Sequence, residues 1–531
     1  MLTFLKKLNL GLSEKQKLVV LTGLAFFLRL VWMFCTDNAL KGDAEARLDK
    51  LYYWIQTKNF GLFDVWPPVH FWLMQIFTWI FPHWIDAPRL LGVILGSALL
   101  LPLFYLIKKN FDSQIAWAST ILYALGGLFI PISTVTMSEI PFIFFVLTAF
   151  YYLYLLLERA QLIDLVVFTI CVCSFSLIRF EGWFLAVYFF ALLFFKGRLP
   201  RKYISLSFIF LVFICFAYTY LIWRSSGKWF YWLQYNDFLV ARMNSIDPTR
   251  FLYLEKIHKI FPAFYPSLLA LALGSLVHFI FRKTKLIFIF FVLIVALPLI
   301  FKTLNHSMES FSRFYLLLSL IIIPLAFSGW KILCTQQKTL STYIVLFLVA
   351  LFEAYGSYNF GSHYYILAIL LCTYLSWTIL KSRPVALGLL IILLISSSLL
   401  RDARTYGRSF RHEDEIQASI NWSLKNISQE SVLLIEESSK LKNAHYLKSL
   451  KRHLDNNMTR FIWAAESITP EINKELENRL ANQQAIYYVS FRENDSKQLF
   501  QERKKELHCN FQVIYSDNAV IIYQINPNYS K

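Results

Sequence analysis

Long apolar runs separated by short polar segments fill the chain from its N-terminus to about residue 400. The first run ends near Cys35, and at about 1.5 Å per residue a helix of this length crosses a bilayer. Further apolar runs lie at 88–107, 113–131, 140–157, 162–178, 183–195, 203–223, 263–281, 286–301, 314–330, 340–356, 363–380 and 384–400. The pattern predicts a multi-pass α-helical membrane protein with about 13 transmembrane helices.

The first apolar run has a second interpretation, which is a cleaved signal peptide. However, it is longer than the apolar core of about 7–15 residues found in signal peptides, and no small-x-small cleavage site follows it. We therefore expect an uncleaved first span with a cytoplasmic N-terminus.

The short segments between the runs alternate in charge. If the first span runs from inside to outside, nearly every short basic segment falls inside, whereas the outside segments near 131–140 and 357–362 contain no Lys or Arg. Charge bias in short loops sets the orientation of a membrane protein. The segments predicted to be cytoplasmic are the N-terminus, Lys108-Lys109, Glu158-Arg159, Lys196–Lys202, Arg282–Lys285, Lys331–Lys338 and Lys381–Arg383.

The apolar segment Val69–Ile85 breaks this alternation if it is counted as a crossing. It contains several tryptophans and an internal His and Pro, which suit a helix that lies in the membrane interface. We therefore predict an interfacial helix here, and the alternative is a further span.

Beyond Leu400 the chain becomes charged and polar, and an odd number of spans places this part outside. Strand-like runs at Val432–Ile435, Phe461–Ala464, Ala485–Phe491, Gln512–Tyr515 and Val520–Gln524 alternate with helix-like stretches near 441–450, 470–483 and 494–506. This alternation predicts a small soluble α/β domain of about 110–130 residues.

We therefore expect two domains. A transmembrane domain covers 1–400, with a first outer loop at 36–87 and a second, basic and aromatic outer loop at 224–262. An extracytoplasmic soluble domain covers 401–531.

Composition agrees with a membrane protein, because 57% of residues are hydrophobic and only 16% are charged, against about 25% charged in soluble domains. The net charge of +18 would suit nucleic acid, but the basic residues cluster between apolar runs, as membrane orientation requires. No nucleic-acid partner is expected. The seven cysteines show no metal-ligand spacing.

The first outer loop carries a dense group of ionisable residues, which are Asp43, Glu45, Arg47 and Asp49. Asp43 lies close to the expected headgroup plane, where it can meet a substrate whose phosphate lies among the headgroups. On a helix, Asp43 and Arg47 share a face. A carboxylate beside a guanidinium stays ionised and can accept a proton from an attacking hydroxyl. The alternative is a solvated loop of mixed charge.

A rigid corner follows, in which Asp64 and His70 flank Trp66-Pro67-Pro68. Two prolines restrict the backbone and remove two hydrogen-bond donors. The corner would therefore hold both flanking side chains in place relative to the membrane. A simple helix-starting turn is the alternative.

Two later outer segments place ionisable residues at the ends of spans. Glu139 follows Ser138 at the outer end of a span, where a buried carboxylate is costly unless it has a partner. Alternatively, this carboxylate stays in contact with water. Arg179 and Glu181 occupy a very short outer turn, where they can pair with each other or Arg179 can face an anionic lipid.

Arg313 enters a late span a few residues after His306 and Glu309. A guanidinium at this position suits a phosphate, to which it can donate two hydrogen bonds. Snorkelling of a long side chain to the interface is the alternative. His306 and Glu309 lack the two-histidine spacing of zinc sites, so no metal site is predicted, and a need for a divalent metal is left open.

In their order and sidedness these motifs resemble the GT-C membrane glycosyltransferases, especially the branch of protein O-mannosyltransferases and bacterial lipid A aminoarabinose transferases. The resemblance covers residues 17–330. The motifs that carry it are Gly42-Asp43 with Arg47, Trp66-Pro67-Pro68, Arg89-Leu90-Leu91, Ser138-Glu139-Ile140-Pro141, Arg179-Phe180-Glu181-Gly182 and Arg313-Phe314-Tyr315.

The resemblance implies an inverting transfer of a sugar from a polyprenyl phosphate or dolichyl phosphate to an acceptor outside the membrane. Asp43 matches the general base of the family, and Glu139 matches an acid that orients acceptor or donor. Arg313 matches a late-span arginine, and Arg47 or Arg179 would also hold the lipid phosphate. The remaining expected substrate-binding residues are Glu45, Asp64, His70 and Glu181.

Two motifs depart from the family pattern. Asp43-Ala44-Glu45 stands where many members have Asp-Glu, and Arg313-Phe314-Tyr315 stands where Arg-Tyr is commoner. The identity of the sugar and of the glycan, lipid or protein acceptor stays open, and the composition points to a bacterial inner or plasma membrane. The alternative function is a transporter or flippase of a lipid-linked saccharide, but such carriers often have internal repeats and charged residues within their spans, and this chain has no such repeat and few such charges.

Overall fold

The computed structural model describes residues 12–35, 44, 47–48, 50–51, 66–81, 85–126, 129–229, 231, 266–281, 285–304, 316–335, 418–419, 421–423, 425–427, 432–436, 461–464, 485–491, 510–516 and 520–526. The chain divides into two compact units, residues 1–35 with 47–400 and residues 36–46 with 401–531. The predicted spans at 340–356, 363–380 and 384–400 and the three predicted C-terminal helices lie outside the described residues. The predicted number of spans, about 13, is therefore not tested.

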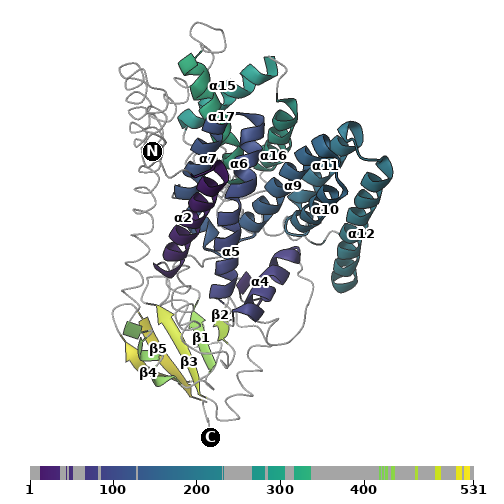
Figure 1. The fold of residues 1–531 in the computed structure, drawn as a ribbon. Helices are drawn as coiled ribbons and strands as arrows, with labels where there is room; N and C mark the ends of the chain where they lie inside the picture. The colour runs from purple at the N-terminus through teal and green to yellow at the C-terminus, as the bar shows by residue number, and fades with distance from the viewer. Residues whose placement is uncertain are drawn as a thin grey trace, which may run out of the picture. The chain divides into compact units, whose positions relative to one another are not determined.

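The first unit is a bundle of helices that follow the predicted apolar runs (Figure 1). The described helices are α2 Glu14–Cys35, α4 Val69–Ile80, α5 Asp86–Ala98, α6 Leu100–Asn110, α7 Ser113–Leu125, α8 Phe129–Ser133, α9 Glu139–Arg159, α10 Leu162–Ser176, α11 Glu181–Lys196, α12 Arg201–Ser226, α15 Pro266–Phe281, α16 Leu286–Leu304 and α17 Leu316–Thr335. The run at 113–131 is not one helix as predicted. Gly126 is extended and ends α7, because glycine favours helix less than other residues except proline.

Four described helical stretches are long and apolar enough to cross a membrane, judged by length and composition: Glu14–Phe34, Asp86–Asn110, Glu139–Arg159 and Arg201–Arg224. The second of these joins α5 to α6. These stretches and the overall apolar pattern place the protein in a membrane.

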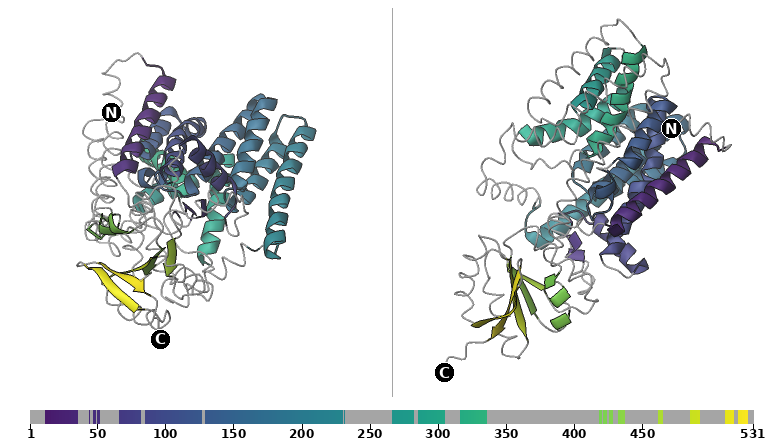
Figure 2. Two further views of the ribbon diagram at one scale, coloured as in Figure 1. Left: turned by 90° about the horizontal axis from the view of Figure 1, so that it is seen from below. Right: turned by 90° about the vertical axis from the view of Figure 1, so that its left-hand side faces the viewer.

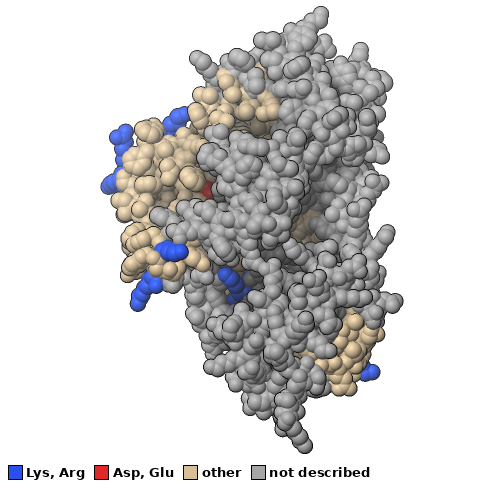
Figure 3. Space-filling view, turned by 180° about the vertical axis from the view of Figure 1, so that it is seen from behind, with Lys and Arg blue, Asp and Glu red and all other residues tan. Residues whose placement is uncertain are grey.

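Helix α12 shows how the bundle meets lipid. Its apolar side chains Leu206 and Phe213 are 66% and 65% exposed, whereas exposed arginines occupy both of its ends, at Arg201 and Arg224. Figure 3 shows this face as an uncharged surface with Lys and Arg gathered at its two ends. An apolar band bounded by cations is typical of a span that anchors its ends in the two headgroup regions.

Aromatic side chains pack the centre of the bundle, where α9, α10 and α11 lie next to one another (Figure 2). Phe150 of α9 is fully buried and lies 4.2 Å, centroid to centroid, from Phe291 of α16. Phe189 of α11 stacks on both rings. Aromatic pairs contribute about 0.5–1.5 kcal/mol each beyond simple burial, so this cluster fixes the positions of the helices that carry the polar residues described below.

The short segments predicted to be cytoplasmic meet at one end of the bundle. Lys108 pairs with Glu14, Lys109 pairs with Glu158, and Lys331 pairs with Asp112. Asp112 also caps α7, because its carboxylate accepts hydrogen bonds from two backbone amides of the first turn. The ion pairs bring together the ends of α2, α6, α9 and α17, so four of these segments share one end. That this end faces the cytoplasm is still a prediction.

Helix α4 is apolar on the outside and polar on the inside. Its twelve residues span about 18 Å, which is less than the hydrocarbon core of about 30 Å. The polar residues His70, Gln75 and Thr78 are buried, whereas Trp79 and Ile80 are more than half exposed. A short helix with tryptophan on its exposed face fits the predicted location in the interface better than a crossing.

The second unit contains a five-stranded sheet in the order β2-β1-β3-β5-β4. The strands are β1 Val432–Glu436, β2 Phe461–Ala464, β3 Ile486–Phe491, β4 Asn510–Ser516 and β5 Val520–Asn526, at the positions of the five predicted strand runs. β1 pairs in parallel with β2 and β3, whereas β5 pairs antiparallel with β3 and β4. The sheet is therefore mixed, and its parallel pairs need crossover connections.

Candidate active site

Three predicted outer segments meet at the end of the bundle opposite the basic segments. The turn between α10 and α11 contacts the start of α4, because the amide of Val69 donates a hydrogen bond of 3.0 Å to the carbonyl of Leu177. The same turn contacts the segment before α9, because Arg179 donates a hydrogen bond of 3.4 Å to the Ser138 hydroxyl. The Pro67-Pro68 corner and the two outer turns are thereby joined.

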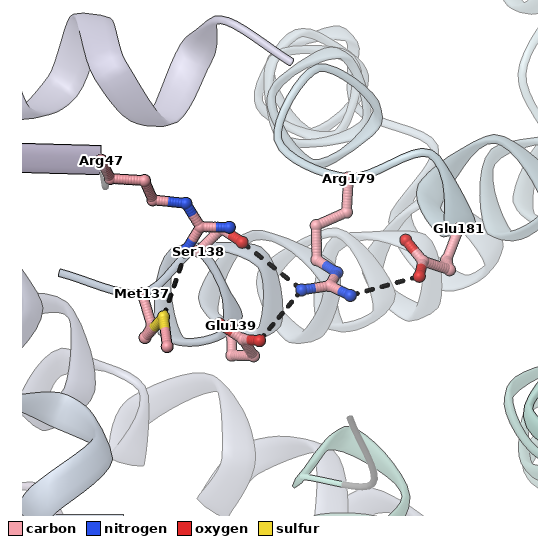
Figure 4. Close-up of polar contacts among 6 residues, drawn as sticks. All are labelled: Arg47, Met137, Ser138, Glu139, Arg179 and Glu181. Carbon is pink, nitrogen blue, oxygen red and sulfur yellow. Dashed lines mark hydrogen bonds and ion pairs between the residues drawn. The ribbon is translucent and has the colours of Figure 1, made fainter. Parts of the chain in front are cut away.

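Arg179 bridges two carboxylates at this junction (Figure 4). Its Nη1 atom lies 3.1 Å from Glu139 Oε1 and its Nη2 atom lies 3.2 Å from Glu181 Oε1. The Glu139 side chain is 6% exposed and that of Arg179 is 15% exposed. Burial lowers the pKa of Arg179, but the two carboxylates outweigh burial and raise its pKa. The guanidinium therefore stays charged and engages protein carboxylates.

The local sequence forces this turn to be tight. The Arg179 amide donates to the Phe175 carbonyl at 3.1 Å, and the Gly182 amide donates to the Arg179 carbonyl at 3.0 Å. A Cβ atom at Gly182 would lie 2.8 Å from the Phe175 carbonyl oxygen, closer than packing allows. Glycine at this position therefore lets α11 start directly against the end of α10, with Glu181 beside Arg179.

Arg47 reaches the same junction from the first outer loop. It is 4% exposed, and its Nη1 atom lies 3.4 Å from Met137 Sδ, next to Ser138 (Figure 4). Its guanidinium carbon lies 4.9 Å from the centroid of the Trp66 ring, a distance typical of cation–π contact. Lys50 Nζ lies 5.0 Å from the same ring. Trp66 thus joins the first outer loop to the proline corner.

His70, in the first turn of α4, lies close enough to Arg47 to be affected by its charge. It is 3% exposed, and its Nδ1 atom has no hydrogen-bond partner in the described part of the chain. Burial, and secondarily the charge of Arg47, lower the pKa of His70 well below its usual value of 6.5. His70 is therefore a neutral imidazole at neutral pH and has hydrogen-bonding capacity left for a bound molecule.

The structure brings together five of the predicted site residues, which are Arg47, His70, Glu139, Arg179 and Glu181. The other four, Asp43, Glu45, Asp64 and Arg313, lie outside the described residues. Among the residues that the structure describes, no group of three His, Cys, Asp or Glu side chains is placed to hold a metal ion.

Two buried arginines received no functional role from the sequence. Arg29 in α2 and Arg89 in α5 are 0% and 1% exposed. Arg29 is the one charged residue in the apolar stretch 18–35, and a charged residue within a span marks a functional position by default. The sequence therefore contained a signal for Arg29. For Arg89 the sequence offered only its place in the motif Arg89-Leu90-Leu91.

The fold of this chain is similar to that of two solved structures of ArnT. The structure of ArnT from Cupriavidus metallidurans bound to undecaprenyl phosphate is similar, with a TM-score of 0.58 and 11% sequence identity, over 96% of this chain and 98% of that chain. ArnT from the same organism in the apo state gives a TM-score of 0.56 and 12% identity, over 95% and 97% of the two chains.

At the level of sequence, residues 65–223 match the family model for dolichyl-phosphate-mannose-protein mannosyltransferases. This segment runs from the proline corner into the last turn of α12 and includes His70, Glu139, Arg179 and Glu181. No curated protein sequence matches the chain. The predicted resemblance to the GT-C glycosyltransferases is confirmed by the family match together with the fold.

Proposed function

We propose that the protein transfers a sugar from a polyprenyl-phosphate or dolichyl-phosphate donor to an acceptor on the outer face of the membrane. The observation that carries this proposal is the buried Arg179, which holds Glu139 and Glu181 next to the segment of Arg47. Two further findings support it. The family model that matches residues 65–223 is that of dolichyl-phosphate-mannose-protein mannosyltransferases. The similar ArnT structure contains bound undecaprenyl phosphate.

Asp43 acts as the general base in this proposal. As an acceptor hydroxyl attacks the anomeric carbon, its proton passes to the Asp43 carboxylate. The bond from the anomeric carbon to the phosphate oxygen breaks, and the lipid phosphate leaves with the bonding electrons. A single displacement of this kind inverts the anomeric centre. Arg47 and Arg313 balance the charge of the phosphate, since guanidinium groups bind phosphate with paired hydrogen bonds.

Glu139 orients the reacting molecules, and Arg179 orients Glu139. Because Arg179 is engaged by two carboxylates, we assign it to holding Glu139 in place and not to binding phosphate. The Glu139 carboxylate then accepts a hydrogen bond from a hydroxyl of the acceptor or of the donor sugar. His70 and Glu181, with Glu45 and Asp64, complete the surroundings of the substrates.

The proposed orientation follows the charge pattern. The end with the basic segments faces the cytoplasm, and the end with Glu139 and Arg179 faces outward, as does the C-terminal domain. The bacterial inner or plasma membrane is the expected location. The acceptor is a glycan, a lipid or a protein.

The test is neutralisation of single carboxylates in the full-length protein reconstituted in lipid nanodiscs. The reaction is followed as release of free polyprenyl phosphate from a panel of polyprenyl-phosphate sugars, in the presence of a cell-envelope extract as the source of acceptor. Asp43→Asn should lower the rate by a factor of about 10²–10⁴, the usual contribution of a general base. Glu139→Gln should lower it as well.

Glu158→Gln is the matched control. Glu158 lies on the same helix as Glu139 but at the opposite end, where its side chain is 56% exposed, so its neutralisation should leave the rate unchanged. A rate for Asp43→Asn equal to wild type would remove Asp43 from its role. Uptake of a lipid-linked saccharide into sealed vesicles without release of polyprenyl phosphate would favour a transporter or flippase instead.

A further inference from the structure

The segment 129–138, between α7 and α9, is buried in the bundle although only its first part is helical. Ser133, Thr134, Thr136 and Ser138 are each 3% exposed or less. Backbone of this kind is tolerated in a membrane protein only where protein or a cavity surrounds it, because its polar groups need partners. The partners that hold this segment therefore decide where Glu139, the next residue along the chain, is placed.

Arg29 supplies one set of these partners. Its Nε atom donates to the Ser133 hydroxyl at 3.2 Å, and its Nη atoms donate to the carbonyls of Ala124 at 3.1 Å and Tyr123 at 3.3 Å. Nη1 also donates to the carbonyl of Ala25 in its own helix at 3.1 Å, and the guanidinium carbon lies 5.2 Å from the centroid of the Tyr123 ring. All of these acceptors are uncharged, so this fully buried cation is held by the oxygens of α7, α8 and α2.

Arg89 of α5 holds the next residue of the segment. Its Nε atom donates to the Thr134 carbonyl at 3.0 Å, and its Nη2 atom donates to the Met33 carbonyl at 2.8 Å. Asp86 balances its charge at 3.4 Å. The two guanidinium groups therefore hold the adjacent residues Ser133 and Thr134 from α2 and α5.

Helix α5 also approaches this point closely. A Cβ atom at Gly96 would lie 2.5 Å from Ser133 Oγ, and one at Gly92 would lie 2.5 Å from the Ser133 carbonyl oxygen. Two glycines four residues apart let a helix approach other backbone closely in a membrane protein. Ser133 is thus fixed both by the hydrogen bond from Arg29 and by close packing against α5.

We propose that Arg29 and Arg89 are positioning residues for Glu139. They fix Ser133 and Thr134, and only four residues separate Thr134 from Glu139, so a displacement of this segment moves the start of α9 away from Arg179. The inference rests on the proposed function for its effect on catalysis, but its structural part, the anchoring of 129–138, stands without it.

The structural part is tested by hydrogen exchange of the full-length protein in nanodiscs. Arg29→Met substitutes an apolar side chain of similar length and removes the hydrogen bonds. Amides of 129–138 should exchange faster by a factor of about ten or more, since a hydrogen bond to a charged group is worth at least this much in an opening equilibrium. Amides of α10 and α11 should be unchanged. Arg29→Lys keeps the charge and should give a smaller increase.

Gly23→Ala is the matched control on the same helix, because nothing lies within 4 Å of a Cβ atom at Gly23, and it should leave exchange unchanged. If Arg29→Met does not fold, Ser133→Ala takes its place, since it removes one acceptor of Arg29 and should give the same pattern with a smaller increase. Unchanged exchange in 129–138 of the folded variant, or an equal increase throughout the bundle, would overturn the proposal.

The catalytic part is tested by combining variants. If Arg29 acts through Glu139, the release of polyprenyl phosphate by the double variant Arg29→Met with Glu139→Gln should be as slow as with Glu139→Gln alone. If the rate of the double variant is instead reduced by the product of the two single-variant reductions, Arg29 acts independently of Glu139, which would contradict the proposed positioning role. If Glu139→Gln itself keeps the wild-type rate, the proposed function of Glu139 fails, whereas the exchange result still decides whether Arg29 anchors the segment.

Discussion

The guanidinium of Arg179 lies 3.1 Å from the carboxylate of Glu139, although the two residues are 40 positions apart in the sequence. Both side chains are largely buried, and Glu181 shares the same guanidinium. The Arg179 guanidinium therefore pairs with both carboxylates. Loss of Arg179 removes both ion pairs, whereas loss of either carboxylate removes only one.

Removal of the Arg179 guanidinium alone should lower the stability of the fold more than removal of both Arg179 and the charge of Glu139. Arg179→Met leaves two carboxylates without their partner, and breaking a buried pair costs about 3–5 kcal/mol. The double variant Arg179→Met with Glu139→Gln should recover part of this loss. Thermal unfolding in detergent measures both. Additive losses would show that Arg179 and Glu139 do not interact in the protein.

A methyl group at Gly182 should disturb the same junction from the backbone side. Gly182→Ala brings a Cβ atom within 2.7 Å of a Phe175 ring atom and 2.8 Å of its carbonyl oxygen. Overpacking of this kind costs about 1–3 kcal/mol, and it should also move Glu181 away from Arg179. Gly23→Ala, which meets no neighbour within 4 Å, should be neutral or slightly stabilising in the same unfolding assay. Equal stability of the two variants would contradict the tight turn.

Stability should fall at acidic pH because of His70. Its pKa in the folded protein is well below the usual 6.5, so below pH 6.5 the unfolded chain binds a proton that the folded protein does not. Stability therefore decreases as the pH falls from 6.5 toward the folded pKa, by up to about 1.4 kcal/mol per pH unit. His70→Gln should remove this component of the pH dependence. Identical pH profiles of unfolding for wild type and variant would show that His70 is not buried in its neutral form.

The sequence predicted the elements around the site better than the contacts within it. Apolar runs marked the helices because burial and lipid contact both require apolar residues. For Glu139 the sequence left two alternatives, a partnered buried carboxylate, because burial of a lone one is costly, or a carboxylate in contact with water. The partner itself could not be predicted, since Arg179 had a nearby acid in Glu181, and only the packing of α9 against α10 brings Glu139 within reach.

Arg29 shows a different limit. It received no role from the sequence, although an arginine within an apolar run is by default a functional position. Its hydrogen-bond acceptors are backbone carbonyls and a serine hydroxyl. Carbonyl groups are present at every residue, so no sequence pattern singles out those of Tyr123 and Ala124. These carbonyls are available because α7 ends just after them, at Gly126. The apolar run 113–131 gave no sign of this helix end.

The depth of α4 in the membrane gives a direct test of the orientation of the whole chain. If α4 lies in the interface, spin labels attached at its exposed positions Trp72 and Trp79 should lie at similar depths in nanodiscs, as measured by relaxation with oxygen and with a water-soluble nickel complex. If α4 crosses the bilayer, seven residues of helix separate the two depths by about 10 Å. The matched pair is Leu206 and Phe213 on α12, also seven residues apart and exposed, which should differ by about this amount in either case. If the depth difference between the two labels is as large for α4 as for α12, α4 crosses the bilayer before α5. The basic segments after it would then face outward, which contradicts the rule that cytoplasmic loops carry the excess of Lys and Arg.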